Sequence, residues 1–329
     1  MPSRVVVVTG ATAGVGRATA IALGRRGDAV ALLGRGRAGL EAAAADVERA
    51  GGRALTVPTD VADADAVDAA ASRVGDELGP IDVWVNNAMA TVFGKVTSTS
   101  PEEFRRATEV TYLGFVWGTM AALRRMVPRD RGSIVQVGSA LSYRAIPLQA
   151  AYCGSKFAVR GFTDSLRSEL LHDGSHVRLT MVQLPAVNTP QFDWGASKMP
   201  KQPRPVAPIF DPDVAAEAVV WATDHDRREL WVGARNVLTM LGAKVAPGAL
   251  DVMLARTGFD GQQTDQPTGA DRPANLFEPA DADDDFGVRG AFGSEAHHRS
   301  VQLELARRRP FSGVLSRPLG AVIARLLGG

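Results

Sequence analysis

Cysteine is nearly absent from this sequence, and charge of one sign is not in excess. The single cysteine, Cys153, excludes an internal disulfide and a metal cluster built from several cysteines. Lysine and arginine number 37 against 36 aspartates and glutamates, so charge gives no reason to expect a nucleic-acid or acidic partner. No uninterrupted apolar run reaches the length of about 18 residues that a membrane span needs.

The sequence also lacks recognisable targeting signals and metal-binding motifs. The opening residues, MPSRVVVVTG, lack the apolar stretch and cleavage site of a signal peptide, so we expect a cytoplasmic protein. No histidine and carboxylate spacing resembles a zinc site, and the acidic run at 281–285 lacks the glycine and distal glutamate of a calcium loop. We therefore expect no metal, and we interpret 281–285 as a solvated linker. The 329 residues suffice for one large domain or two small ones.

The first clear pattern is a strand followed by a glycine-rich turn. Residues 4–9 (RVVVVT) are typical of a strand buried on both faces of a parallel sheet. TGATAGVG follows, with Gly10, Gly14 and Gly16, and then an alanine-rich helical stretch. Glycines allow a tight turn and close approach of the backbone, and a helix N-terminus offers unpaired N–H groups to a pyrophosphate. The pattern predicts a dinucleotide site.

The end of the next expected strand, 29–33, bears on the choice of cofactor. A carboxylate there would bond the ribose 2′-hydroxyl of NAD, whereas an arginine can pair with the 2′-phosphate of NADP. The residues at this point are Gly34-Arg35-Gly36-Arg37, and Asp28 lies at the wrong end of the strand. The sequence favours NADP(H) over NAD(H), with Arg35 as the main contact and Arg37 as a secondary one. The alternative is that both arginines are solvated turn residues.

Strands and helices alternate regularly along the first 235 residues. Further strands are expected at 54–57, 81–85, 133–137, 177–183 and 229–232, with helices at 38–50, 63–78, 101–126, 150–172 and 213–224. The alternation predicts an α/β fold, a three-layer doubly wound parallel sheet of Rossmann type, over residues 1–235. Ligands of such sheets bind beyond the carboxyl ends of the strands.

A possible proton-transfer pair lies on the helix expected at 150–172. Tyr152 and Lys156 are four residues apart, so both side chains project from one face of that helix. An ammonium held close lowers the pKa of a phenol from its ordinary value near ~10. Such a phenol can exchange a proton with a carbonyl or alcohol oxygen while a hydride moves at the adjacent carbon. Ser139, at the end of a strand, could hold the same oxygen.

Taken together, residues 4–235 resemble a short-chain dehydrogenase/reductase of the single-domain branch with a Tyr-x-x-x-Lys motif. TGATAGVG is similar to the family's glycine motif, Asp60-Val61 to the acid that meets the adenine, and Asn86-Asn87-Ala88 to the motif that stabilises the sheet beside the cofactor. Pro185–Thr189 is similar to the segment that closes on the nicotinamide carboxamide.

The resemblance implies roles for individual residues. Tyr152 would be the general acid/base, Lys156 would hold the nicotinamide ribose and lower the pKa of the tyrosine, and Ser139 would orient the substrate oxygen. The implied cofactor contacts are Gly10, Thr12, Gly14, Val15, Gly16, Arg35, Asp60, Val61, Asn87, Tyr152, Lys156, Pro185, Val187 and Thr189.

Two positions depart from the family pattern. Thr111 stands where the family has a fourth catalytic residue, an asparagine whose carbonyl supports a proton-relay water. Threonine could keep the carbonyl, but it puts the local helix bend in doubt. Met89 stands where the family usually has glycine, and its side chain would either narrow the space beside the nicotinamide or face the core.

Residues 236–329 form an extension beyond the expected domain. Residues 236–258 are apolar and helical in pattern, whereas 260–300 are polar and are expected to be extended or partly disordered. Apolar residues recur at helical spacing between Leu319 and Leu327, after Arg307-Arg308-Arg309. This segment would pack on the enzyme or on a second subunit, or would touch a membrane surface as a peripheral contact.

The sequence therefore predicts an NADP(H)-dependent oxidoreductase that interconverts an alcohol and a carbonyl. The apolar loop at 141–149 and the aromatic loop ending near Phe210 suggest a hydrophobic small molecule as substrate. We expect a homo-oligomer and no nucleic-acid partner. The alternative is a non-catalytic NADP(H)-binding sensor or scaffold, which would explain Thr111 and Met89 but need not keep Ser139, Tyr152 and Lys156.

Overall fold

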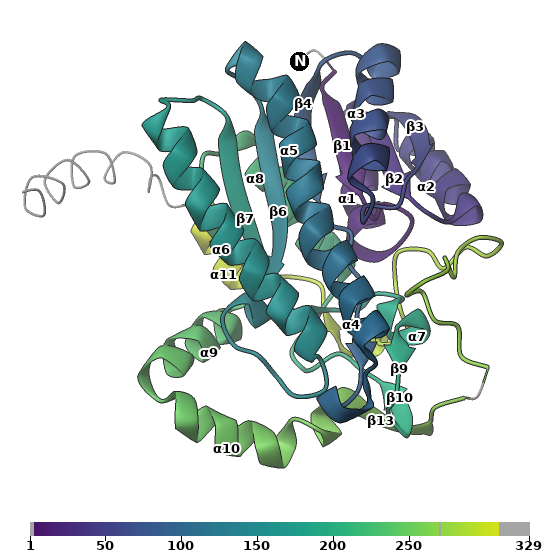
Figure 1. Cartoon of the computed structure of the whole chain (residues 1–329), viewed down its shortest axis with the longest axis vertical. Helices are drawn as coiled ribbons and strands as arrows, with labels where there is room; N and C mark the ends of the chain where they lie inside the picture. Colours follow the sequence, from purple (N-terminus) through teal and green to yellow (C-terminus); the bar gives the residue numbers. More distant parts are fainter. Residues whose placement is uncertain (1–2, 270, 309–329) are drawn as a thin grey trace, which may run out of the picture.

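A seven-stranded parallel sheet forms the centre of the protein. The computed structural model describes residues 3–269 and 271–308. The order across the sheet is β12-β7-β6-β4-β1-β2-β3, which reverses direction beside β1 and confirms the predicted doubly wound topology (Figure 1). The strands are β1 (Val5–Thr9), β2 (Ala29–Gly34), β3 (Arg53–Pro58), β4 (Ile81–Asn86), β6 (Ser133–Ser139), β7 (Arg178–Leu184) and β12 (Glu229–Trp231).

Helices cover both faces of the sheet, because successive residues of a buried strand point to opposite sides. Val5 and Val7 of β1 belong to one buried hydrophobic cluster, and Val6 and Val8 belong to a second. The first cluster contains residues of α3 (Ala64–Leu78), α4 (Pro101–Thr108), α5 (Gly114–Met126) and α6 (Ala150–His172). The second contains residues of α1 (Gly14–Gly24), α2 (Arg37–Arg49) and α8 (Pro212–Asp224).

The helix boundaries follow local signals in the sequence. The carboxylate of Asp63, at the start of the helix expected at 63–78, caps α3 by accepting from the amides of Asp65 and Ala66. Ser100 and Glu103 form a capping box ahead of Pro101. The single helix expected at 101–126 is divided into α4 and α5 by a π-helical turn, Glu109–Leu113.

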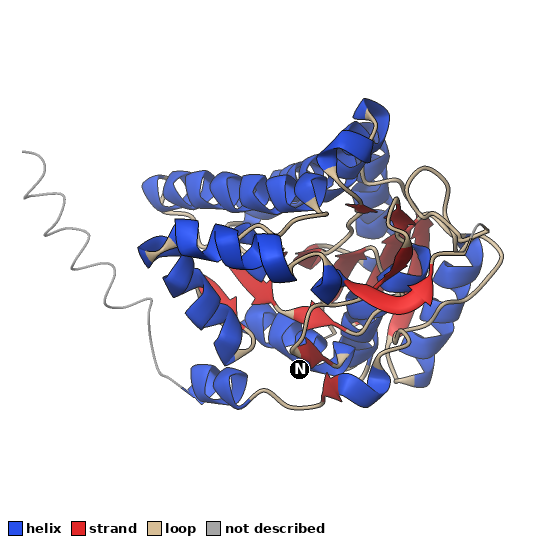
Figure 2. Ribbon diagram, turned by 90° about the horizontal axis from the view of Figure 1, so that it is seen from below, coloured by secondary structure: helices blue, strands red, loops and turns tan. Residues whose placement is uncertain are grey.

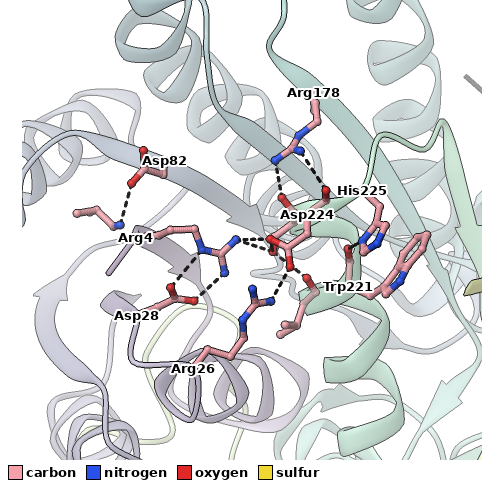
Figure 3. Close-up of polar contacts among 11 residues, drawn as sticks. Arg4, Arg26, Asp28, Asp82, Arg178, Trp221, Asp224 and His225 are labelled. Carbon is pink, nitrogen blue, oxygen red and sulfur yellow. Dashed lines mark hydrogen bonds and ion pairs between the residues drawn. The ribbon is translucent and has the colours of Figure 1, made fainter. Parts of the chain in front are cut away.

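The amino end of the sheet is fastened by an ion-pair network. Arg4 pairs with Asp28 at 2.7 Å and with Asp224 at 2.6 Å, and Arg26 also pairs with Asp224 (Figure 3). These contacts join the start of β1 and of β2 to the end of α8. They place Asp28 far from the carboxyl ends of the strands, as the sequence predicts.

Short elements lie beyond the carboxyl ends of the main strands, below the sheet in Figure 1 and toward the viewer in Figure 2. The stretch expected as a loop after Pro190 contains a short helix and three strands. β8 (Ala186–Val187) pairs with β11 (Ile209–Phe210), and β5 (Val92–Phe93) pairs with β9 (Ala196–Ser197). α7 (Gln191–Trp194) and β10 (Lys201–Pro203) complete this region.

The extension returns to the same end of the molecule. It contains α9 (Ala234–Val245), α10 (Pro247–Thr257), β13 (Gln263–Pro267), β14 (Ala296–His297) and α11 (Val301–Arg308). β13 pairs with β10, and β14 pairs with β11. Within the described residues, none of the helices combines the length and the apolar character that a membrane crossing requires. The segment predicted to be amphipathic, 319–327, lies outside the described residues.

Candidate active site

The turn between β1 and α1 can be built only with glycine at its key positions. Gly10 and Gly14 have φ angles of 63° and 55°, in the left-handed region. A Cβ on Gly16 would lie 2.1 Å from the carbonyl oxygen of Gly10. The amide nitrogen Nδ2 of Asn87 donates to the carbonyls of Thr9 and Gly10 at 3.0 and 3.1 Å. Asn87 thereby holds the turn against the end of β4, as the sequence predicts.

A cavity of about 390 Å³ lies at the carboxyl ends of the strands and gathers most of the predicted site residues. Those that line it are Gly10, Thr12, Gly14, Val15, Asn87, Ser139, Tyr152, Lys156, Pro185, Val187 and Thr189. Residues from both halves of the fold, far apart in the chain, therefore share one cavity. Gly16, Arg35, Asp60, Val61 and Thr111 do not line it.

Lys156 is buried beneath the cavity, with only 2% of its surface exposed. Its ammonium Nζ donates to the carbonyl of Val137 at 2.8 Å and lies 4.4 Å from the centre of the Phe115 ring. Burial lowers the pKa of Lys156 to about 7. Nζ lies 5.6 Å from the centre of the Tyr152 ring, so it approaches the face of the phenol.

Tyr152 and Ser139 form the polar pair of the cavity. Burial raises the pKa of Tyr152 above its ordinary value, and a hydrogen bond with Ser139 opposes this rise. The predicted lowering of the pKa of Tyr152 by Lys156 is not present in this structure. The Ser139 hydroxyl accepts from the amide of Leu141 at 3.1 Å, which fixes it at the last position of β6.

Thr111 lies within the π-helical turn and is fully buried. The turn shows that the helix departs from regular α geometry here even though asparagine is absent. Met89 lines the cavity, so its side chain faces the site and not the core. Cys153 is buried and does not line the cavity, and burial raises its pKa to about 11.

Two of the residues predicted for the adenosine end, Arg35 and Asp60, are engaged by other parts of the chain. Arg35 donates to the carbonyl of Phe277 at 2.6 Å and to Oδ1 of Asn275 at 2.9 Å. Asp60 pairs with Arg106 at 2.5 Å. Burial tends to raise the pKa of Asp60, but the hydrogen bonds from Arg106 and from the amide of Ala62, together with the charges of Arg106 and Arg35, hold that pKa below its ordinary value.

Arg37 agrees with its interpretation as a solvated residue, whereas the acidic run 281–285 does not. Arg37 is exposed and pairs with Glu41 at 3.5 Å on the surface of α2, which corresponds to the solvated alternative. Asp281 is buried and Asp285 pairs with Arg17, so the interpretation of 281–285 as a solvated linker is wrong at these two positions. A buried acid in a polar segment has no local sequence signal, because its partners lie more than 240 residues away.

The far wall of the cavity comes from segments that carry no recognisable motif. It includes residues 204–208, Arg235, Met253, Leu254 and Asn275. Gln262 is buried and links this wall to loop 141–149, which precedes α6. It donates to the carbonyl of Pro147 at 2.8 Å and accepts from Nε2 of Gln149 at 2.7 Å. Leu141, Ile146 and Gln149 line the cavity, which confirms the predicted role of loop 141–149 as its border.

A glycine turn of the phosphate-binding type and a Ser, Tyr and Lys set in one cavity define a Rossmann-type oxidoreductase that uses a nicotinamide dinucleotide. Residues 4–198, more than half of the chain, match the family of short chain dehydrogenases. The chain belongs to the short-chain dehydrogenase/reductase family.

Three similar proteins carry the names of oxidoreductases or dehydrogenases. The Bacillus subtilis protein called uncharacterized oxidoreductase YxnA is 28% identical over 84% of this chain and 79% of its own length. Mouse estradiol 17-beta-dehydrogenase 11 is 28% identical over 74% of this chain and 80% of its own length. An alcohol dehydrogenase from Thermococcus sibiricus, solved with 5-hydroxy-NADP, superposes with a TM-score of 0.60 at 30% identity, over 70% of this chain and 96% of that one.

Proposed function

We propose that this oxidoreductase uses NADP(H) to interconvert an alcohol and a carbonyl on a hydrophobic small molecule. The observation that carries the proposal is the shared cavity, in which Ser139, Tyr152 and Lys156 face the glycine turn. A protein that only sensed or stored a dinucleotide would need the turn but not this polar set.

The residues present fit a dinucleotide at its pyrophosphate and nicotinamide end. A Cβ on Gly10 would lie 2.7 Å from Cα of Ala88, so glycine lets the turn pack directly against the backbone after β4, and Gly10 itself lines the cavity. The turn would hold the pyrophosphate, and Pro185, Val187 and Thr189 would hold the carboxamide. The nicotinamide, when bound, supplies or accepts the hydride.

Arg35 is the group that supports NADP over NAD, because no acid follows β2. It lies at the start of α2, where the guanidinium could pair with a 2′-phosphate once its contacts to residues 275–277 are given up. Asp60 and Val61 would contact the adenine once the contacts of Arg35 to residues 275–277 are given up.

The proton chemistry belongs to the chain itself. The Tyr152 hydroxyl would give its proton to the carbonyl oxygen in reduction and take it from the alcohol in oxidation. The Ser139 hydroxyl would donate to the same oxygen and position it. Lys156 would hold the nicotinamide ribose, and with a pKa of about 7 it can gain or lose a proton near neutral pH. Thr111 would act through the π-helical turn and not by direct contact.

The shape and lining of the cavity support an apolar substrate. Leu141, Ile146, Phe192, Trp194 and Leu254 all line it. The name of the mouse relative, an estradiol dehydrogenase, agrees with a substrate of this kind. A homo-oligomer, a cytoplasmic location and contact of the C-terminal segment with a membrane stay predictions from the sequence.

Tyr152→Phe, with Tyr112→Phe as the matched control, tests the proposal. Tyr112 packs against Phe115 outside the cavity. A panel of apolar ketones and aldehydes is screened by loss of NADPH absorbance, and NADPH binding is measured separately. We expect Tyr152→Phe to lower turnover by at least about 10²-fold, the usual contribution of a general acid, with binding nearly unchanged. Full activity in Tyr152→Phe would contradict the assigned role. NADPH binding without turnover in the wild type would favour the sensor.

A further inference from the structure

Residues 275–287 of the extension, called the strap below, lie across the adenosine end of the dinucleotide site. Arg35 donates through Nη1 and Nη2 to atoms of residues 275–277. Leu276 is only 2% exposed and belongs to the same buried hydrophobic cluster as Val61 and Ala88. The carbonyl of Leu276 also accepts from Nε of Arg106 at 3.0 Å. The strap thus contacts Arg35, predicted for the 2′-phosphate, and Arg106, which pairs with Asp60.

The middle of the strap covers the start of α2. The carbonyls of Asp281 and Ala282 accept from the amides of Gly39 and Ala38, which have no partner within the helix. A Cβ on Gly36 would lie 2.0 Å from Oδ1 of Asp281, so the carboxylate rests against the backbone where a 2′-phosphate would approach Arg35. Two negative groups cannot share this place at low cost.

The far end of the strap reaches the glycine turn itself. Asp285 pairs with Arg17 of α1, and the carbonyl of Gly287 accepts from the amide of Gly14 at 3.2 Å. Gly14 begins α1, so its amide is one of those that a pyrophosphate would otherwise engage. The strap therefore spans the site from the 2′-phosphate position to the pyrophosphate position.

The cavity ends where the strap begins. Asn275 lines the cavity, whereas Arg35, Asp60 and Val61 do not. The space for the nicotinamide end is thus open, and the space for the adenosine end is filled by the chain.

We propose that the strap is an autoinhibitory contact that occupies the adenosine end of the dinucleotide site and leaves it when NADP(H) binds. The proposal rests on the proposed function. The carboxylate of Asp281 lies near enough to Arg35 for the two charges to interact, so release of the strap would free Arg35 for a 2′-phosphate. The apparent affinity for the cofactor is then reduced by the fraction of molecules in which the strap is displaced.

The first test compares Leu276→Ala with Phe277→Ala in the full chain. Phe277 is the next residue and is 51% exposed, so its truncation leaves the buried anchor in place. NADPH and NADH are titrated by fluorescence. We expect Leu276→Ala to lower the apparent Kd for both by at least about tenfold, since truncating a buried leucine weakens docking of the strap. Phe277→Ala should bind like the wild type. If Leu276→Ala bound NADPH and NADH no more tightly than the wild type, the proposed autoinhibition by the strap would be wrong.

The second test uses a charge pair, in case Leu276→Ala folds poorly. Asp285→Asn breaks the contact with Arg17, and Asp284→Asn changes the exposed neighbour as a control. We expect tighter NADPH binding only in Asp285→Asn. In the wild type, amide hydrogen exchange within 275–287 should become faster when NADP⁺ is added. Slower exchange would mean that the segment closes over the cofactor, which contradicts displacement.

The outcomes separate the two proposals. If NADPH and NADH bind but neither Leu276→Ala nor Asp285→Asn differs from its control, the proposed autoinhibition is wrong and the proposed function stands. If neither dinucleotide binds the wild type or any variant, the proposed function is wrong and the strap falls with it. Binding by Leu276→Ala alone would support both.

Discussion

The side chain of Thr111 and the backbone of Ala90 share two hydrogen bonds. Oγ1 of Thr111 donates to the carbonyl of Ala90 at 2.8 Å and accepts from its amide at 2.9 Å. Both groups of Ala90 are thereby satisfied in a segment that is buried. Thr111 thus ties the π-helical turn to the loop after β4, beside Met89 and the cavity.

Replacement of Thr111 by valine should therefore destabilise the protein. Valine has nearly the shape of threonine but leaves the amide and carbonyl of Ala90 without a partner. Each lost partner costs about 1–3 kcal/mol when the group is buried. Thr111→Ser, which keeps the hydroxyl, should stay close to the wild type. Thermal unfolding of the three proteins measures the difference, and equal midpoints for valine and serine would show that the two bonds contribute nothing.

Lys156 should make the stability of the cofactor-free protein depend on pH in the neutral to alkaline range. Its pKa is about 7 in the folded protein and near ~10.4 in an unfolded chain. Between these values the unfolded state binds more protons, so the contribution of Lys156 to stability rises with pH. The midpoint of the wild type minus that of Lys156→Met should increase from about pH 7 to about pH 10. Lys95→Met, at an exposed position, should keep the wild-type trend. A difference that stays constant with pH would argue against a depressed pKa.

Asp281→Asn should shift the cofactor preference toward NADPH. The substitution removes a negative charge at the start of α2 while keeping the backbone contacts of residue 281. The ratio of the Kd for NADH to the Kd for NADPH should rise by on the order of tenfold, or ~1.4 kcal/mol. Asp283→Asn, at an exposed position of the same run, is the control. If the ratio of the two Kd values were unchanged in both variants, Asp281 would not lie near the 2′-phosphate position.

Gly16→Ala should abolish dinucleotide binding and lower stability. The added methyl would lie 2.1 Å from the carbonyl oxygen of Gly10 and 2.6 Å from Nδ2 of Asn87, so the turn must distort. Gly75→Ala is the matched control, because Gly75 is also helical and a Cβ there meets nothing within 4 Å. The control should be more stable than the wild type by about 0.5–1 kcal/mol, since alanine favours the helix. NADPH titration and thermal unfolding of both variants distinguish these effects. Normal binding by Gly16→Ala would contradict the close packing of the turn.

Local patterns were sufficient for much of the fold and for the nicotinamide end of the site. The buried valines of β1, the glycine turn and the cap at Asp63 are set by neighbours in the chain, so the sequence predicted them well. Ser139 and Tyr152 could be paired because Ser139 follows an expected strand and Tyr152 lies at the start of the next expected helix, so both fall at the edge where the carboxyl ends of the strands meet.

The partners of Arg35 and Asp60 could not be predicted in the same way. Arg35 is bonded to a segment 240 residues further along the chain, where composition indicates only a polar stretch. The anchor of that segment is the buried side chain of Leu276, and one apolar residue produces no periodicity. Likewise, the bonds of Thr111 to Ala90 depend on the π-helical turn, which has no signal in the residue types.

The place of the strap near the end of the chain affects how the enzyme is made. Domains fold from the N-terminal side during synthesis. A nascent chain that has reached residue 235 already contains every strand of the main sheet, together with Ser139, Tyr152 and Lys156. Residues 275–287 emerge later, so the nascent chain can take up dinucleotide before its competitor is present.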